Sequence, residues 1–241
     1  MKKFLILILV FTILSPGCKE DEMEDTASVN VQIVPKIGNE TLVLDQAYTD
    51  AGGLRIKVNF LKFYLSHLSL VSTDGSLAEL KDIALFDYEN PSVISAEVTD
   101  GEYSGIHFGL GLNPEQNNSD PDSFPASHPL SYAQAMHWDT WIKYKFLIIE
   151  GRVDEDTTGT DWTKAYSYHT GFDDVFREVE IARNLIIENG QNNIVINLDI
   201  NKIFYGVNDT IDLLTENNVH GSSTELALAM RLSDLCKNAF E

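Results

Sequence analysis

The chain has 241 residues, 44% of them hydrophobic, and a formal net charge of −20 at neutral pH. This is enough for one large β-domain or two small domains with a real hydrophobic core. The acidic excess excludes nucleic acid as a partner, because phosphate contacts need a basic surface. An acidic surface is compatible with cation capture, although solubility explains it equally well.

The first 17 residues have the pattern of a lipoprotein signal peptide. Lys2 and Lys3 precede an apolar run over residues 4–14, which is too short to span a bilayer and has the length of a signal h-region. The run leads to Ser-Pro-Gly-Cys, so we expect cleavage before Cys18 and lipid attachment to it. Removal of the two lysines takes the net charge from −20 to −22. With Cys18 acylated, Cys236 has no partner for an intramolecular disulfide.

An acidic stretch follows Cys18. Residues 19–25 read Lys-Glu-Asp-Glu-Met-Glu-Asp, which resembles the tether that sends Bacteroidetes-type lipoproteins to the cell surface, and a plain solvated spacer is the alternative. We assign residues 1–17 to the signal peptide, 18–27 to an acidic tether and 28–241 to a single β-domain. The expected location is the outer membrane, on its periplasmic or its outer side.

Alternating apolar residues predict the first strands of the domain. Residues 29–33 alternate up to Pro35, which indicates an edge strand because proline cannot donate to a neighbouring strand. Residues 54–70 alternate too, but the apolar phase slips by one position after Phe60. Such a slip predicts a β-bulge or a bend between sheets.

Turn signals and one long loop organise the middle of the chain. Residues 73–75 read Thr-Asp-Gly and predict a hairpin, followed by a short strand over residues 83–86. Residues 103–112 predict a strand with His107 on the face opposite its apolar side chains. Residues 113–129 are rich in Asn, Asp, Ser and Pro without periodicity, which predicts a long surface loop.

The second half begins with a predicted hairpin. An apolar strand runs to Gly151, residues 154–160 form a polar tip, and residues 162–172 form the return strand. Antiparallel pairing around this tip brings His169 within a few residues of the position opposite Lys145.

The remaining pattern completes the predicted fold. It comprises strands over residues 175–181 and 193–200, a helical turn over 201–205, and a C-terminal helix with a cap at residues 222–225 and an apolar stripe of Leu226, Met230, Leu235, Cys236 and Phe240. The fold class is therefore mainly β, an antiparallel β-sandwich with a long loop before the Met-x-Trp motif and a C-terminal helix.

The stretch over residues 136–141 is the densest in chemistry. It reads Met-His-Trp-Asp-Thr-Trp, and so combines a thioether and an imidazole, donors that suit copper, with two indoles. Tryptophan is the most easily oxidised aromatic side chain, so the stretch points to a transition metal or a redox event. The alternative is that Met136, Trp138 and Trp141 are core residues where a turn enters a strand.

Motifs along most of the chain resemble the MbnP-like family. They are Phe63-Tyr64-x-Ser66, the glycine-rich residues 101–111, Met136-x-Trp138-x-x-Trp141-x-x-Tyr144-x-Phe146, Glu150-Gly151, Tyr166-x-Tyr168-His169-x-Gly171 and the closing residues 236–240. Two positions depart from the family pattern. Trp141 stands three residues after Trp138 rather than two, and Lys143 stands near the place of a glycine.

The resemblance implies an extracytoplasmic copper-binding protein of the kind named for methanobactin operons. In some relatives a di-haem cytochrome c peroxidase of the MauG type oxidises a tryptophan to kynurenine, which then takes part in copper binding. Carried onto this chain, the motif positions are Met136, Trp138 and His169, with Trp138 as the first candidate for oxidation and Trp141 as the second.

Further candidate copper ligands are chosen on chemical grounds. Imidazole and thioether bind a soft or borderline cation without adding buried charge, so His137, His67 and His220 join the motif residues as candidates. The expected role is copper capture, storage or transfer, without enzymatic activity, because no hydrolase motif is present. The alternative is a metal-free surface lipoprotein that binds glycan or protein through exposed Trp138, Trp141 and Trp162.

Overall fold

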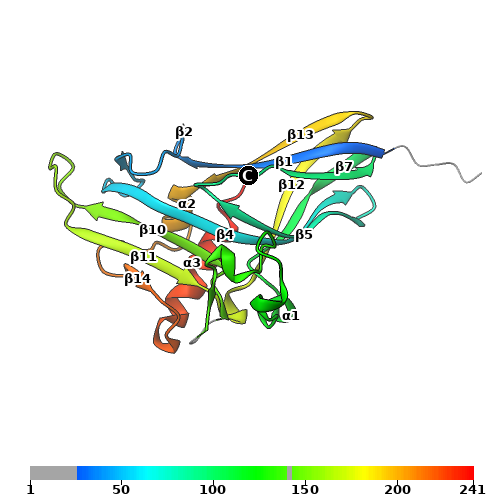
Figure 1. Ribbon diagram of the computed structural model, residues 1–241. Helices are drawn as coiled ribbons and strands as arrows, with labels where there is room; N and C mark the ends of the chain where they lie inside the picture. The colour runs from blue at the N-terminus through cyan, green and yellow to red at the C-terminus, as the bar shows by residue number, and fades with distance from the viewer. Residues whose placement is uncertain (1–25, 140–142) are drawn as a thin grey trace, which may run out of the picture.

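The computed structural model describes residues 26–139 and 143–241, and it confirms the predicted fold class. Two β-sheets face each other, and the C-terminal helix packs beside the larger sheet (Figure 1). The expected tether boundary falls inside the first strand, which begins at Thr26. Among the described residues, no helix has the length and apolar character needed to cross a bilayer.

The smaller sheet corrects the prediction of an edge strand near Pro35. Its four strands are β1 (Thr26–Ile37), β2 (Glu40–Thr41), β6 (Ile94–Thr99) and β13 (Gln191–Asp199). Strand β1 is central, because it pairs in parallel with β13 on one side and antiparallel with β6 and β2 on the other. Pro35 lies where pairing with β6 has ended at Val31, and its carbonyl still accepts from the backbone of Leu42 at 2.9 Å. Proline lacks only the donor, so it is tolerated at such a gap.

The larger sheet has the order β12-β7-β4-β10-β11-β14, with β3 and β5 also paired to β4. Its strands are β3 (Tyr48–Thr49), β4 (Arg55–Ser72), β5 (Leu77–Asp87), β7 (Gly101–Leu110), β10 (Leu147–Asp154), β11 (Lys164–Thr170), β12 (Arg177–Ile187) and β14 (Asn218–Val219). A separate hairpin joins β8 (His137–Trp138) to β9 (Lys143–Tyr144). The predicted hairpins β4–β5 and β10–β11 are confirmed, while the contact of β11 with β14 is parallel.

The predicted phase slip in β4 lies next to a β-bulge in its pairing with β10, where Phe60 faces Glu150 and Val58 faces Gly151. A second bulge lies further along the strand. Pairing with β7 runs to Ser66 and resumes at Ser69, with a register shift between them. His67 lies inside this interval and has a left-handed φ of 50°. A bulge redirects the side chain at its centre, so the irregularity decides where His67 points.

Aromatic side chains fill the interior between the sheets. Phe63 stacks on Phe86 with ring centroids 4.7 Å apart, and Phe240 meets Phe108 edge to face at 5.1 Å. Phe240 also forms an isolated bridge with Leu198 of β13, so the end of the chain joins the smaller sheet to this core.

Two helices follow the last long strand. They are α2 (Ile200–Phe204), the expected helical turn, and α3 (Leu226–Lys237), preceded by the expected cap, in which Ser222 and Glu225 form a capping box. Cys236 is fully buried on α3, as expected. Met230 was expected on the apolar stripe, but it is 38% exposed because the buried face of the helix runs through Ala229 and Leu232.

The predicted long surface loop contains a short helix, α1 (Pro114–Asn117). Asn113 accepts a hydrogen bond from the backbone of Gln116 at 2.9 Å, and the Gln116 side chain accepts from the backbone of Asn113 at 3.1 Å. This reciprocal capping box, with Pro114 in the first turn, forms the helix without any apolar periodicity. Because Gln116 and Asn117 are buried, the loop is part of the folded domain.

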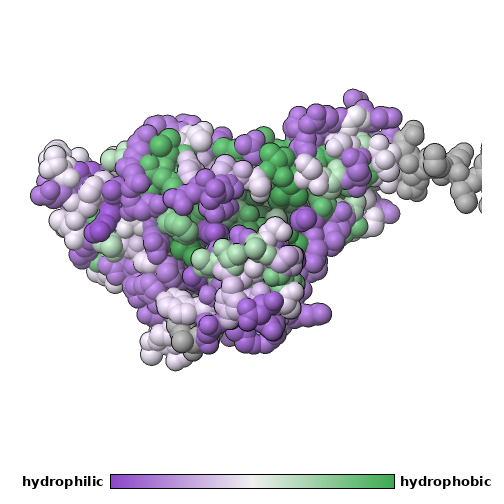
Figure 2. Space-filling view, viewed as in Figure 1, coloured by the Kyte–Doolittle hydropathy of each residue, from purple (hydrophilic) through white to green (hydrophobic). Residues whose placement is uncertain are grey.

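The sandwich is open along one side. Figure 2 shows apolar side chains gathered between the two sheets near β1 and β5, with hydrophilic residues around them. A cavity of about 600 Å³ lies there, lined on its apolar side by Ile83, Leu85 and Ile94.

We predict that Gly151→Ala destabilises the domain by about 1–3 kcal/mol, the usual cost of overpacking. A Cβ at this position would collide with the Lys57 carbonyl oxygen and the Tyr166 hydroxyl, which are hydrogen-bonded to each other at 3.0 Å. Urea unfolding measures the change. The control is Gly53→Ala, whose Cβ meets open space, so only its positive φ opposes the change. Equal losses in the two variants would contradict the collision.

Candidate metal site

The β10–β11 hairpin places three polar side chains on its outer face. Glu150 pairs with Ser167, and Ile148 pairs with His169. The position opposite His169 is therefore three residues from Lys145, which agrees with the prediction from the length of the hairpin. Because neighbouring residues of a strand point to opposite faces, Tyr166 and Tyr168 enter the core while Ser167 and His169 point outward.

His169 is the centre of this polar group. Its Nε2 lies 2.6 Å from Glu150 Oε1 and 3.4 Å from the Ser167 hydroxyl. The same hydroxyl lies 3.2 Å from His220 Nε2, and the two imidazole rings meet edge to face with centroids 4.7 Å apart. We call His169, His220, Glu150 and Ser167 the outer-face group.

The C-terminal cap brings His220 to this group. The backbone of His220 donates to Glu225 at 2.9 Å, and Glu225 is also the glutamate of the capping box that precedes α3. The preceding strand β14 pairs with β11 at Ser167 and Tyr168. A residue 51 positions after His169 in the chain is therefore held beside it.

The other ring nitrogen of His169, Nδ1, is held inside the protein. Nδ1 is buried and has no hydrogen-bond partner among the described residues, although the side chain as a whole is 13% exposed. Burial lowers the pKa of His169 below its usual value; the hydrogen bond to Glu150 opposes this shift, and the nearby His220 and Lys145 add to it. A neutral imidazole with a spare lone pair is the form that binds a metal ion.

Trp138 lies next to His169. The β8–β9 hairpin positions its ring 6.2 Å from the His169 ring, centroid to centroid, with Lys145 Nζ 5.5 Å from the indole centroid. Burial lowers the pKa of Lys145, with nearby Glu150 acting in the opposite direction. The motif tryptophan and the motif histidine are thus neighbours.

His137 lies in a different environment from its neighbour Trp138. Its ring packs edge to face on Tyr144 at 4.7 Å and on Tyr132 at 5.2 Å, and its Nδ1 lies 2.9 Å from Asp139 Oδ1. Successive residues of a strand diverge in direction, which explains the separation. Met136 is fully buried, and its carbonyl accepts from the backbone of Lys145 at 2.8 Å.

The backbone conformation of Lys143 shows why a glycine is usual near this position in the family pattern. Its φ is 62°, in the left-handed region that favours glycine. The hairpin therefore keeps a glycine-like backbone here while carrying a lysine, whose ammonium contacts Asn118.

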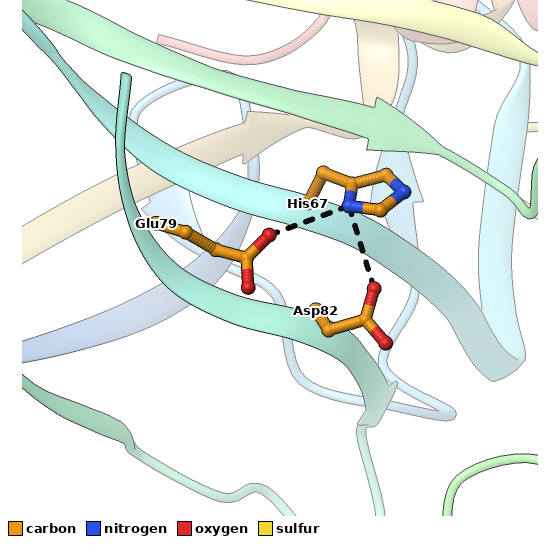
Figure 3. A group of neighbouring side chains, drawn as sticks. All are labelled: His67, Glu79 and Asp82. Carbon is orange, nitrogen blue, oxygen red and sulfur yellow. Dashed lines mark hydrogen bonds and ion pairs between the residues drawn. The ribbon is translucent and has the colours of Figure 1, made fainter.

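His67 belongs to a second group, drawn in Figure 3 with Glu79 and Asp82. Its Nδ1 lies 3.4 Å from a carboxylate oxygen of each, and the three ligand atoms lie within 4.8 Å of one another. Among residues 26–139 and 143–241 this is the one such group of His, Cys, Asp and Glu atoms. It is exposed, whereas the imidazole of His169 is largely buried.

Hydrogen bonding on the far side of the His67 ring argues against metal binding. The Asn113 and Gln116 amide nitrogens lie 3.2 and 3.5 Å from His67 Nε2. The capping box uses the oxygens of both amides, so their NH₂ groups face the ring and Nε2 must accept. The proton is then on Nδ1, where it faces the two carboxylates. Metal binding at Nδ1 would require the ring proton to move to Nε2. There it would face the NH₂ groups of Asn113 and Gln116, which are also donors.

Cys18 and Trp141 lie outside the described residues. Cys236 is unsuited to bind a metal, because burial raises the pKa of its thiol to about 12. Sequence reasoning missed Glu150 and Ser167 as site residues, although the Glu-Gly motif and the hairpin alternation place both beside His169.

The fold and this site define a β-sandwich with an imidazole pair beside a tryptophan. A model of the MbnP family matches residues 26–224, and the chain belongs to this family. A similar solved structure is MbnP from Methylosinus trichosporium, with 16% identity and a TM-score of 0.52 over 77% of this chain and 79% of that one, which supports the fold. No curated protein matches the sequence.

We predict that acid destabilises the wild-type protein more than the His169→Gln variant. The pKa of His169 is lowered on folding, so the unfolded state binds the proton more tightly. The stability from neutral His169 is therefore present above the unfolded pKa of about 6.5 and lost as pH falls through that value toward the folded one. Urea unfolding at pH 7.5 and pH 5 measures the difference, and equal losses in both proteins would contradict it.

Proposed function

We propose that this protein binds copper outside the cytoplasm, at a site built on His169 and His220 beside Trp138. Membership of the MbnP family supports copper as the metal. The observation that carries the location is the buried Nδ1 of His169, which has no hydrogen-bond partner within residues 26–139 and 143–241 and lies next to a second imidazole.

The residues of the outer-face group fit copper. Two imidazoles are donors that suit copper, and Glu150 adds a carboxylate that compensates positive charge. The largely buried His169 side chain limits competition from water. Copper bound there would be held by nitrogen donors, while Lys145 on the Trp138 ring tunes the local charge.

The other candidate residues have less support as ligands. His137 packs on Tyr144 and its Nδ1 faces Asp139 Oδ1 at 2.9 Å, and the His67 group has its hydrogen bonds satisfied on both sides of the ring. Met136 remains a candidate through the family motif.

Tryptophan stacking as the main function has weaker support. A glycan platform needs open indole faces, but the Arg55 guanidinium covers the Trp162 ring at 4.2 Å from its centroid, and Lys57 lies 5.4 Å away. Trp138 is half-buried between His169 and Lys145.

The proposal includes two modifications. Lipid attachment at Cys18 would anchor the domain to the outer membrane through the acidic tether. Oxidation of Trp138 to kynurenine by a partner di-haem peroxidase, with hydrogen peroxide as the oxidant, would cleave the indole C2–C3 bond, add oxygen and release C2 as formate. The amine nitrogen and the ketone of the product would then lie beside His169, since the two rings are neighbours. Whether copper is captured, stored or transferred depends on the partner.

We predict that the chain lacking residues 1–18 retains about one copper ion per molecule after incubation with copper and gel filtration. His169→Ala and His220→Ala reduce this content, because each removes an imidazole of the outer-face group. His128→Ala serves as the matched control, since His128 stacks on Phe124 in a separate environment. Loss of copper in His67→Ala, with retention in His169→Ala, would move the site to the His67 group.

We predict that co-expression with a di-haem peroxidase of the MauG type adds oxygen to Trp138. Mass spectrometry of proteolytic peptides should find the product on the peptide that contains Trp138, and the peptide with Trp162 should stay unmodified because its ring is covered by Arg55. Trp138→Phe is the control. Modification confined to Trp162 would refute this assignment.

A further inference from the structure

We propose that Glu150 is a positioning residue that holds both His169 and His220 with their protons on Nε2, so that copper binds through Nδ1. This inference rests on the proposed copper site, and it assigns a role to Glu150 and Ser167. The positions of the protons in the outer-face group follow from which of its atoms can donate a hydrogen bond and which can only accept one.

The first step concerns His169. A carboxylate oxygen can only accept a hydrogen bond, and Glu150 Oε1 lies 2.6 Å from His169 Nε2. Nε2 therefore carries the ring proton. In a neutral imidazole the other nitrogen then has a lone pair, and Nδ1 of His169 is buried with no hydrogen-bond partner among the described residues.

The second step passes through Ser167. Its hydroxyl lies 3.1 Å from the same Glu150 oxygen, and because the carboxylate accepts, the hydroxyl proton points to Glu150. A hydroxyl has one proton, so the serine oxygen must accept from His220 Nε2 at 3.2 Å. His169 Nε2, 3.4 Å from the same hydroxyl, already donates to Glu150. His220 Nε2 therefore also carries a proton, and its Nδ1 has the lone pair.

The chain of donors ends at one oxygen of Glu150. This oxygen receives His169 Nε2–H directly and His220 Nε2–H through Ser167. Carboxylates in this relation to a metal-binding imidazole fix the ring orientation and raise the basicity of the ligating nitrogen, and their loss typically costs 10–100-fold in metal affinity.

The fold holds Glu150 in this place. Its strand position faces Ser167 across β10 and β11, and the register shift against β4 falls between Glu150 and Gly151. The glycine lets the Tyr166 hydroxyl and the Lys57 carbonyl approach, which fixes the strand beside the carboxylate.

The variants separate the role of the carboxylate from the role of the fold. Glu150→Gln keeps an oxygen acceptor for Nε2–H, whereas Glu150→Leu removes it. Ser167→Ala interrupts the path to His220 and leaves the Glu150–His169 hydrogen bond in place.

The experiment is long-range proton–nitrogen NMR of the histidine rings in the ¹⁵N-labelled mature chain, first without metal and then with Cu(I), which is diamagnetic. We expect the Nε2–H pattern for His169 and His220 without metal. On adding Cu(I), the Nδ1 resonance of His169 shifts. Glu150→Leu loses the Nε2–H pattern and binds Cu(I) about 10–100-fold more weakly in competition with a chelator. Glu150→Gln keeps most of the Nε2–H pattern and most of the Cu(I) affinity. Ser167→Ala alters only the pattern of His220.

The outcomes distinguish the two proposals. An Nδ1–H pattern in the metal-free protein, or a Cu(I) shift at Nε2 of His169, overturns the role of Glu150 and leaves the copper site standing. An absence of any histidine shift with Cu(I) overturns the copper site itself. Equal losses of Cu(I) affinity in Glu150→Gln and Glu150→Leu also overturn the positioning role, because an oxygen that accepts from Nε2–H would then make no difference to binding.

Discussion

The pairing of the long strand β4 is the constraint on which both histidine groups depend. β4 runs from Arg55 to Ser72 and pairs with β5, β7 and β10, so a bulge in it shifts the register of its pairing with a neighbouring strand. One register shift lies at Glu150 and Gly151, beside the outer-face group, and another falls around His67. Bulges of this kind concentrate near functional sites because they redirect side chains out of the regular alternation.

The sequence predicted the parts of the fold that depend on local periodicity. The phase slip after Phe60 indicated the bulge of β4 against β10, and the polar tip at residues 154–160 located the β10–β11 hairpin. Partner choice over long distances leaves no such mark, so the parallel pairing of β1 with β13 was missed. The first half of β5 was missed because Glu79, Lys81 and Asp82 face solvent and interrupt its apolar pattern.

The candidate site was predictable only along the hairpin. The count around its tip brought His169 close to Lys145, and the Met-x-Trp motif supplied Trp138, but the approach of His220 depends on the parallel contact between β14 and β11 and on the cap of α3. His67 was a candidate by residue type alone. Its satisfied state depends on the capping box of α1, whose Asn113 and Gln116 are 46 and 49 positions away in the chain.

The two histidine groups contain the same kinds of side chain and differ in how their hydrogen bonds are distributed. At His67, both ring nitrogens have partners, with carboxylates on the Nδ1 side and amide donors on the Nε2 side. At His169, carboxylate and hydroxyl both lie on the Nε2 side, and Nδ1 is buried with no partner in the part of the chain that the structure describes. Clustering of ligand atoms alone would favour the first group. A metal ion, however, needs a lone pair that nothing else occupies, and the described structure offers that at His169.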